Sequence, residues 1–204
     1  SIGKGVNGNS KRNRVLSQLS GDPSKLERRL LTHENPKSPI SEAYRSLRTS
    51  LTYLSGRKDN VSTMLISSAG PGEGKTTTVA NLAITYANMG KRTLLVDTDL
   101  RKPVLHKVFK INNEIGISHY LSSNEDNIDK IIIKSNIENL SIVTSGVVPP
   151  NPSELLGSIR MKEFIDSINN SDNWDIILFD TSPLIAVTDA VVLSQYVDNF
   201  ILVS

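Results

Sequence analysis

A glycine-rich stretch between an apolar run and a helical pattern constrains the fold of this chain more than any other feature. In "LISSAGPGEGKTTTVANLAITYA", residues 65–87, the apolar run ends near Ser67 and a helix is expected from about Lys75. The glycines between them let the backbone turn and approach a ligand without a Cβ in the way. The start of the following helix presents backbone N–H groups, which attract negative charge. The stretch therefore predicts a strand, a phosphate-wrapping loop and a helix.

The segment "AGPGEGKT" matches the phosphate-binding P-loop, with Ala69 in place of the usual first glycine. In such a loop the Lys75 ammonium reaches the β- and γ-phosphates, and the Thr76 hydroxyl binds Mg²⁺. Thr77 is placed to touch the α-phosphate side. ATP and Mg²⁺ are therefore the predicted cofactors. The predicted nucleotide-binding residues are Gly70, Gly72, Glu73, Gly74, Lys75, Thr76 and Thr77.

Four short apolar runs, "TMLIS", "TLLVD", "IILFD" and "FILVS", are too short for helices and nearly continuous rather than alternating. Such runs are typical of strands buried on both faces of a parallel sheet. Helical patterns separate them, over about residues 75–89, 117–122, 152–168 and 188–196, and "LSIVTSG" is a candidate fifth strand. The predicted fold class is α/β, a doubly wound, mostly parallel sheet of the P-loop NTPase type. In this fold, ligands gather beyond the carboxyl ends of the strands.

Three aspartates lie at the predicted ends of strands. Asp97 and Asp99 occur in "LLVDTDLRKP", and Asp180 occurs in "IILFDTSP". Two residues apart on an extended chain, Asp97 and Asp99 face the same way. Mg²⁺ prefers oxygen ligands and keeps several waters, so Thr76, a phosphate oxygen and water-bridged carboxylates suffice for a metal site. Asp97 and Asp99 could each face the metal or a hydroxyl, and Asp180 is similar to the carboxylate that orients the metal's water shell in P-loop proteins. Taken alone, each aspartate could equally be a turn residue or a helix cap.

Other polar residues carry weaker signals. Arg101 follows the acidic pair and is a candidate phosphate contact, although a basic residue at such a corner is usually solvated. His33, His106 and His119 are scattered and make no recognisable metal set. The chain has no cysteine, which excludes disulfides and cysteine-ligated zinc.

Composition divides the chain into a basic arm and a P-loop domain. With 204 residues and 38% hydrophobic composition, one sizeable core is expected. Residues 1–58 carry 12 Lys and Arg against 4 Asp and Glu, which leaves 11 against 17 for the remainder. We expect a flexible basic arm over residues 1–37 and the P-loop domain over residues 38–204. The arm suits a membrane surface or an acidic partner, or is simply solvated, whereas nucleic acid is not expected because no aromatics are interleaved.

A helix is predicted over "SPISEAYRSLRTSLTYLSG", with Ser38 as N-cap, Pro39 in the first turn and Gly56 as the stop. Its packing face is predicted to hold Ile40, Ala43, Tyr44, Leu47, Leu51 and Leu54. Glu42, Arg45 and Arg48 then lie on the opposite face. That face is either solvated or available to a partner.

These motifs together resemble the bacterial tyrosine kinases of capsule and exopolysaccharide synthesis, of the type in which the cytoplasmic kinase is a separate chain. The resemblance rests on "AGPGEGKTT", "LLVDTDLRKP", "VTSG" with "VPPNPSELL", "IILFDTSP" and "PKSPISEAYRSLRT". It implies a fold related to the partitioning ATPases and a kinase domain over residues 38–204. It also implies Asp97 on the Mg²⁺ shell and Asp99 as the base for a tyrosine hydroxyl. With Arg101 added from its position after the acidic pair, the predicted catalytic set is Lys75, Asp99 and Arg101.

The resemblance implies partners as well. Glu42, Arg45 and Arg48 match the family's subunit-contact spacing, which implies a homo-oligomeric ring that phosphorylates tyrosines between subunits. The cytoplasmic tail of a membrane adaptor would activate the kinase at the inner face of the cell membrane, and a cognate tyrosine phosphatase would reverse the reaction. Family members continue past the last strand and end in a tyrosine cluster. Here the five tyrosines are dispersed and the sequence stops at "NFILVS", so a truncated C-terminal end is expected.

Two other functions stay open at this point. A partitioning or septum-positioning ATPase would share the sheet, but its loop usually has a lysine where this chain has Gly70. A nucleotide-gated scaffold without catalysis would share the loop. The set of Asp97, Asp99 and Asp180 favours catalysis.

Overall fold

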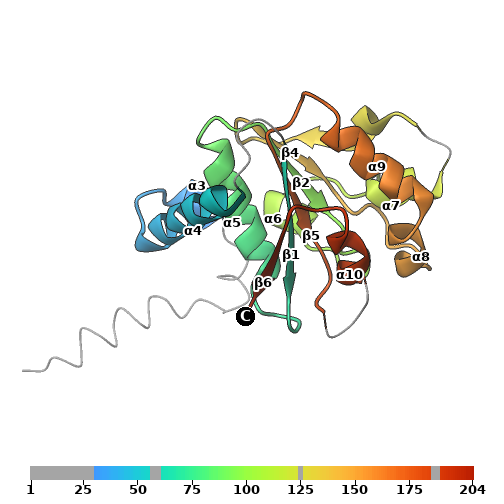
Figure 1. Cartoon of the computed structure of the whole chain (residues 1–204), viewed down its shortest axis with the longest axis horizontal. Helices are drawn as coiled ribbons and strands as arrows, with labels where there is room; N and C mark the ends of the chain where they lie inside the picture. Colours follow the sequence, from blue (N-terminus) through green and yellow to red (C-terminus); the bar gives the residue numbers. More distant parts are fainter. Residues whose placement is uncertain (1–29, 56–60, 124–125, 185–188) are drawn as a thin grey trace, which may run out of the picture.

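The computed structural model describes residues 30–55, 61–123, 126–184 and 189–204, and it contains one six-stranded sheet (Figure 1). The order across the sheet is β3-β4-β2-β5-β1-β6. All neighbouring pairs are parallel except β3 with β4. The strands are β1 (Ser62–Ser68), β2 (Thr93–Asp97), β3 (Ile132–Lys134), β4 (Leu140–Val143), β5 (Ile176–Asp180) and β6 (Asn199–Val203).

Helices cover both faces of the sheet, with α3, α4 and α5 on one side and α7 to α10 on the other (Figure 1). The short α6 packs on the α5 side through Leu105 and Val108. The helices are α3 (Leu31–Glu34), α4 (Pro39–Ser55), α5 (Lys75–Ala87), α6 (Leu105–Phe109), α7 (Ile117–Ser122), α8 (Pro152–Leu156), α9 (Ile159–Asn169) and α10 (Asp189–Ser194), with a 3₁₀ turn over Ile128–Ile131.

The central strands bury side chains on both faces. In β2, Leu94 and Val96 join the core under α7 to α10, whereas Leu95 joins the core under α5. Alternate residues of β5 divide in the same way. Because both faces are covered, these strands read as continuous apolar runs in the sequence. The predicted fold class is therefore confirmed.

The register of the sheet brings the chemistry of three strands to one edge. Strand β5 lies between β1 and β2, and Asp180 pairs in register with both Ile66 and Asp97. Since the strands are parallel, the loop after β1 emerges beside the ends of β2 and β5. The glycine-rich loop and two of the predicted aspartates thus meet at the carboxyl edge, as expected for this fold.

Some elements were not predicted. Strand β3 has three residues and lies antiparallel at the edge, and α6 has five residues, so neither is long enough to show a period. The single helix expected over residues 152–168 is two helices. Ser158 begins the second one as its N-cap, where its side chain accepts a hydrogen bond from the Met161 N–H.

The start of α4 is as predicted, but its packing face differs. The Ser41 N–H donates to Ser38 Oγ at 3.1 Å, which is the expected cap. Ile40 is 49% exposed, and Ala43 is also exposed. Arg48, predicted on the opposite face, donates from Nη1 to the Thr85 carbonyl on α5 at 3.0 Å. The packed stripe therefore includes Arg48, because its long side chain reaches a helix carbonyl that a leucine could not satisfy.

The prediction of a flexible arm through residue 37 is wrong at its C-terminal end. Residues 31–34 form α3, which packs on α5. Thr32 is buried, and both its N–H and its hydroxyl donate to Asn81 Oδ1 at 2.9 Å. These bonds satisfy a buried amide of α5, so the folded body begins before Ser38. Residues 1–29 of the predicted arm, the Gly56 stop and the Leu54 side chain lie outside the described residues.

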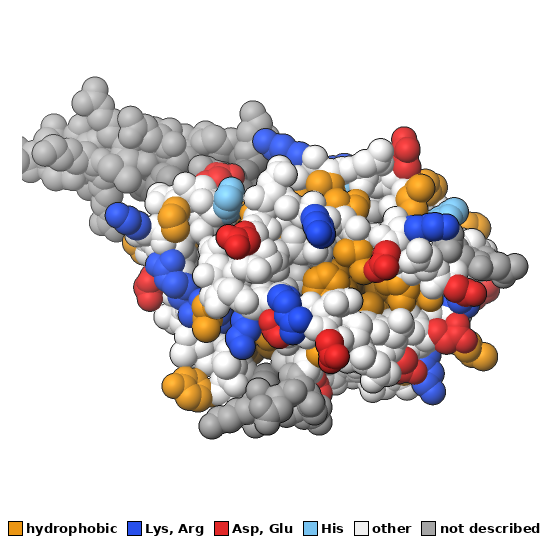
Figure 2. Space-filling view, turned by 90° about the horizontal axis from the view of Figure 1, so that it is seen from above, with side chains coloured by type: hydrophobic (Ala, Val, Ile, Leu, Met, Phe, Trp, Pro, Cys, Tyr) orange, Lys and Arg blue, Asp and Glu red, His pale blue; other side chains and the backbone are white. Residues whose placement is uncertain are grey.

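The surface of the described part carries charges of both signs. Figure 2 shows Lys and Arg side chains interspersed with Asp and Glu side chains around a patch of hydrophobic side chains. On this face, the basic residues do not form one continuous stripe. Within the described ranges, no helix combines the length and the apolar character needed to cross a bilayer.

Candidate active site

The glycine-rich loop between β1 and α5 adopts a conformation that requires glycine at two positions. Gly72 and Gly74 have φ of 81° and 77°, in the left-handed region. A Cβ at either position would meet no heavy atom within 4 Å, so these glycines face open space. Backbone strain, rather than a clash, therefore selects glycine here, and it leaves room beside the loop for a ligand.

Glu73 and Ser68 hold the loop in shape. The Gly70 N–H donates to Glu73 Oε2 at 2.9 Å, and the Ser68 hydroxyl donates to the Gly70 carbonyl at 2.7 Å. The Glu73 carboxylate thus bonds to the loop itself. In this structure Glu73 stabilises the glycine-rich loop, and its predicted part in nucleotide binding would be to keep that loop in shape.

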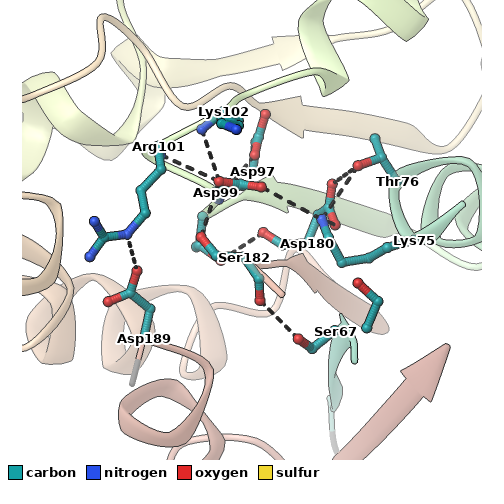
Figure 3. A network of polar contacts seen from close by, with 12 residues as sticks. Ser67, Lys75, Thr76, Asp97, Asp99, Arg101, Lys102, Asp180, Ser182 and Asp189 are labelled. Atoms are coloured by element: carbon teal, nitrogen blue, oxygen red, sulfur yellow. Dashed lines mark hydrogen bonds and ion pairs between the residues drawn. The ribbon is translucent and has the colours of Figure 1, made fainter. Parts of the chain in front are cut away.

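Lys75 and Thr76 open α5 and turn toward the end of β5 (Figure 3). The Lys75 ammonium makes a hydrogen-bonded ion pair with Asp180 Oδ1, and the Thr76 hydroxyl donates to Asp180 Oδ2 at 2.8 Å. Asp99 Oδ2 lies 3.9 Å from Lys75 Nζ. Residues predicted from three separate motifs, Lys75, Asp99 and Asp180, therefore meet at one ammonium group.

Charge is unbalanced in this cluster. The carboxyl groups of Asp97, Asp99 and Asp180 are all buried, and the cation among them is Lys75. Burial, followed by repulsion from Asp180 and Asp99, raises the pKa of Asp97 well above its ordinary value. Burial also raises the pKa of Asp180 despite the neighbouring ammonium. Burial lowers the pKa of Lys75, but the attraction of the three carboxylates outweighs it, and the net pKa is raised.

One oxygen of Asp97 is left without a partner. Asp97 Oδ1 accepts from the Asp99 N–H at 3.1 Å, whereas Oδ2 is buried and makes no hydrogen bond in the described part of the chain. A buried polar atom in that state is costly unless water or an ion satisfies it. The orphaned oxygen, the Thr76 hydroxyl and the excess of negative charge fit a hydrated Mg²⁺.

A Mg²⁺ site at this position does not require protein side chains to surround the ion completely. The described residues include no group of three or more His, Cys, Asp or Glu arranged to enclose an ion. Mg²⁺ usually takes one or two protein ligands together with phosphate oxygens and water. Thr76 would bind it directly, and Asp97 and Asp180 would orient its waters.

A cavity of about 380 Å³ opens beside these groups. The glycine-rich loop forms one wall, and the segment after β2 forms another. Thr77 at the start of α5 also lines it, as predicted. The lining includes Gly72, Gly74, Lys75, Thr76, Thr77, Asp99, Arg101, Lys102 and Ser182.

Arg101 lies at the rim of the cavity with its guanidinium turned away from Lys75 (Figure 3). Its Nε donates to Asp189 Oδ2 at 3.1 Å, and its Nη2 donates to Ser153 Oγ at 2.6 Å. Asp189 is buried, and Ser153 in turn donates to its other oxygen at 2.7 Å. Arg101 therefore connects α8 and α10 to the rim of the cavity through Ser153 and Asp189, and its predicted catalytic role stays a prediction.

Sequence reasoning missed Ser182, Ser153 and Asp189. Ser182 follows Asp180 in "DTSP", and Ser153 lies in "PPNPSELL", so both were inside quoted motifs but were given no role. Asp189 had no signal, because a lone aspartate at a helix start usually caps that helix.

The predicted interface residues lie on α4, away from this cavity. There Arg45 pairs with Glu42 at 2.7 Å within the same helix.

Comparison with known proteins points to the same family as the sequence motifs. Residues 62–203 match the family described as "AAA domain". The chain is 41% identical over 180 residues to the tyrosine-protein kinase YwqD of Bacillus subtilis, covering 88% of this chain and 74% of that protein. The solved kinase domain of the Escherichia coli tyrosine kinase ETK superposes with a TM-score of 0.80 and 36% identity, covering 86% of this chain and 67% of that one.

A more distant match places the fold in a wider group. The septum site-determining protein MinD from Pyrococcus horikoshii, solved in complex with Mg-ADP, superposes with a TM-score of 0.58 and 25% identity over 71% of this chain and 58% of that one. The expected relation to partitioning and septum-positioning ATPases is thus confirmed for the fold. Identity and coverage are both higher for the kinases than for MinD, and the motifs from "AGPGEGKTT" to "IILFDTSP" lie within residues 62–203. The chain belongs to the family of bacterial tyrosine kinases built on a P-loop.

Proposed function

We propose that this chain binds Mg·ATP in the cavity beside the glycine-rich loop and transfers the γ-phosphoryl group to tyrosine, acting between subunits as an autokinase. The observation that carries the proposal is the meeting of Lys75, Thr76 and three buried carboxyl groups at one edge of the sheet. The loop amides and Lys75 would hold the phosphates, and Thr76, Asp97 and Asp180 would hold the hydrated Mg²⁺.

Asp99 is the proposed base. It lines the cavity, and its Oδ2 lies 3.9 Å from the Lys75 ammonium, which hydrogen-bonds Asp180 instead. As the tyrosine oxygen forms its bond to the γ-phosphorus, the bond to the β,γ-bridging oxygen breaks and ADP leaves. The hydroxyl proton passes to Asp99. Bound Mg²⁺ would supply neutralisation of the phosphate charge, while positioning by the loop and Lys75 supplies most of the remaining catalysis.

Hydrolysis of ATP without transfer is the main alternative, since MinD shares the fold. The kinase is favoured because the loop has Gly70 where such ATPases usually carry a second lysine, and because the relatives with the higher identity are kinases. A non-catalytic scaffold would need ATP binding but no base. Asp99 in the cavity argues against that reading.

The first prediction concerns phosphoryl transfer. The whole natural protein that carries this chain, incubated with γ-labelled ATP and Mg²⁺, should acquire label on tyrosine, and the label should increase when the cytoplasmic tail of the membrane adaptor is added. Lys75→Met and Asp99→Asn should each lower the label about 100-fold or more, because one removes the phosphate cation and the other the base. Asp166→Asn, an exposed aspartate on α9, is the matched control and should retain full activity.

Mapping of the label separates the alternatives. A protein tyrosine phosphatase should remove the label, and Tyr53, which is 83% exposed, is the first internal acceptor to test by Tyr53→Phe. Release of free phosphate without protein label would contradict the kinase and support the ATPase. Nucleotide binding with neither product would support the scaffold.

The second prediction concerns the buried charge. Because folding raises the pKa of Asp97, its contribution to stability is full below its unfolded pKa of about 3.9 and is lost as pH rises through the higher folded value. Asp97→Asn should therefore match wild type near pH 4 and become more stable toward neutral pH, by about 1–2 kcal/mol, or about 2–8 °C in Tm. Thermal unfolding of the nucleotide-free protein measures this difference.

Mg²⁺ bound with nucleotide should reverse the stability advantage of Asp97→Asn over wild type. Mg·ADP should raise the Tm of wild type more than ADP alone, and Asp97→Asn should lose most of the extra increase. Asp166→Asn should behave as wild type throughout. Equal Tm values for wild type and Asp97→Asn at every pH would show that the buried carboxyl group carries no such cost.

We propose that α4 contributes to the contact between subunits of a ring, and that the adaptor holds this ring at the inner face of the cell membrane to regulate capsular polysaccharide assembly. Glu42 and Arg45 lie on the outer face of α4, with 67% and 36% of their side chains exposed. Arg48 is less available, because it bonds the Thr85 carbonyl. The contact would therefore depend mainly on Glu42 and Arg45.

The third prediction tests this contact. Glu42→Arg and Arg45→Glu should each shift the assembly toward monomers in light scattering, with little change in monomer Tm because exposed pairs contribute only about 0–1 kcal/mol. Lys162→Glu on α9 is a charge-reversal control that should leave assembly unchanged. Arg48→Ala should instead lower monomer Tm. Unchanged assembly in both α4 variants would exclude these residues from the interface.

A further inference from the structure

Ser182, in the loop that follows β5, is buried beside the proposed base. Its side chain is almost wholly inaccessible, with 2% exposure for the residue. Its hydroxyl donates a hydrogen bond to Asp99 Oδ1 at 3.0 Å (Figure 3). A buried hydroxyl that bonds a carboxylate oxygen makes a charge-assisted contact, which is stronger than a neutral one.

The backbone of Ser182 is fastened to the neighbouring strand. The Ser67 hydroxyl on β1 donates to the Ser182 carbonyl at 2.8 Å. Two residues later, the Leu184 N–H donates to the Ser68 carbonyl of the same strand at 2.8 Å. The Ser182 hydroxyl is therefore presented from a fixed position on the central strands.

Asp99 Oδ1 accepts two other hydrogen bonds, from the N–H groups of Arg101 at 3.3 Å and Lys102 at 3.1 Å. Both donors belong to the same turn as Asp99, so they move with it. The Ser182 bond differs because it comes from the loop after β5, which is itself hydrogen-bonded to β1, the strand that leads into the glycine-rich loop. With three donors on Oδ1, Oδ2 is the oxygen left to face Lys75, 3.9 Å away.

We infer that Ser182 is a positioning residue for phosphoryl transfer, which fixes the plane of the Asp99 carboxylate so that Oδ2 receives the tyrosine proton. The inference rests on the proposed function of the site. The Ser182 hydroxyl bonds Asp99 Oδ1. It acts through Asp99, and a base held in one orientation needs no reorganisation when the hydroxyl arrives.

Single-turnover kinetics with a separate measurement of nucleotide binding test this role. Ser182→Ala should lower the rate constant for tyrosine labelling about tenfold, as expected for loss of one hydrogen bond to a charged group, while the Kd for Mg·ADP stays within about twofold of wild type. Ser182→Thr keeps the hydroxyl and should recover most of the rate. In an Asp99→Asn background, Ser182→Ala should cause no further loss.

The control is Ser145→Ala, which removes an equally buried hydroxyl that bonds Asn113 and the Gly146 carbonyl. It should leave the rate constant within about twofold of wild type. Wild-type rates in Ser182→Ala, a parallel loss of nucleotide affinity, or a full additional loss in the Asp99→Asn background would each overturn the inference while leaving the kinase intact. Absence of tyrosine label in the wild-type protein would instead overturn the proposed function, and this inference with it.

Discussion

Three buried carboxyl groups share one lysine at the carboxyl edge of the sheet, and the other features of the site depend on this imbalance. Lys75 bonds to Asp180 and lies near Asp99, and Asp97 keeps one oxygen without a partner. In the low dielectric of a protein interior, such a cluster is unfavourable unless more positive charge enters. A hydrated Mg²⁺ would supply that charge beside Asp97 and Asp180, whereas the negative phosphates would lie against the loop N–H groups and Lys75. The cluster is best understood as a site prepared for its ligand.

The sheet topology makes this concentration of charge possible. Since β5 lies between β1 and β2, the glycine-rich loop and the two acidic segments must meet at one edge. The cores on both faces are continuous and apolar, so they can support a locally unfavourable cluster. A stable scaffold that tolerates a destabilising active site is the usual compromise between stability and activity.

The sequence was sufficient for the parts of the molecule that local patterns determine. Continuous apolar runs identified five of the strands, and the spacing of "AGPGEGKT" located the glycine-rich loop. The run "FILVS" was expected to be buried on both faces, but in the edge strand β6 Phe200 and Leu202 are 42% and 49% exposed. The aspartates were found from the apolar runs as well, since each lies at the end of one. The sequence could not show the orphaned oxygen of Asp97 or the contact between Asp99 and Lys75, which depend on strand order.

The errors came from long polar side chains and from tertiary contacts. Periodicity placed Arg48 on an open face, but its side chain reaches the Thr85 carbonyl on α5. The bond from Arg101 to Asp189, which is 88 residues away in sequence, was not predicted either. Thr32 lies in a polar, basic stretch, yet it is buried because Asn81 needs its donors. In each case a buried acceptor decided the position, and no local pattern in the sequence marks such an acceptor.

A crystal structure of the protein with Mg·ADP tests the central claim most directly. The account predicts that the phosphates lie against the backbone of residues 70–76, with Mg²⁺ on the Thr76 hydroxyl and a metal-bound water on the Asp97 oxygen that now has no partner. Asp180 should exchange part of its contact with Lys75 for the metal's water shell. A nucleotide bound elsewhere, or a Mg²⁺ ion remote from Asp97 and Asp180, would contradict the account.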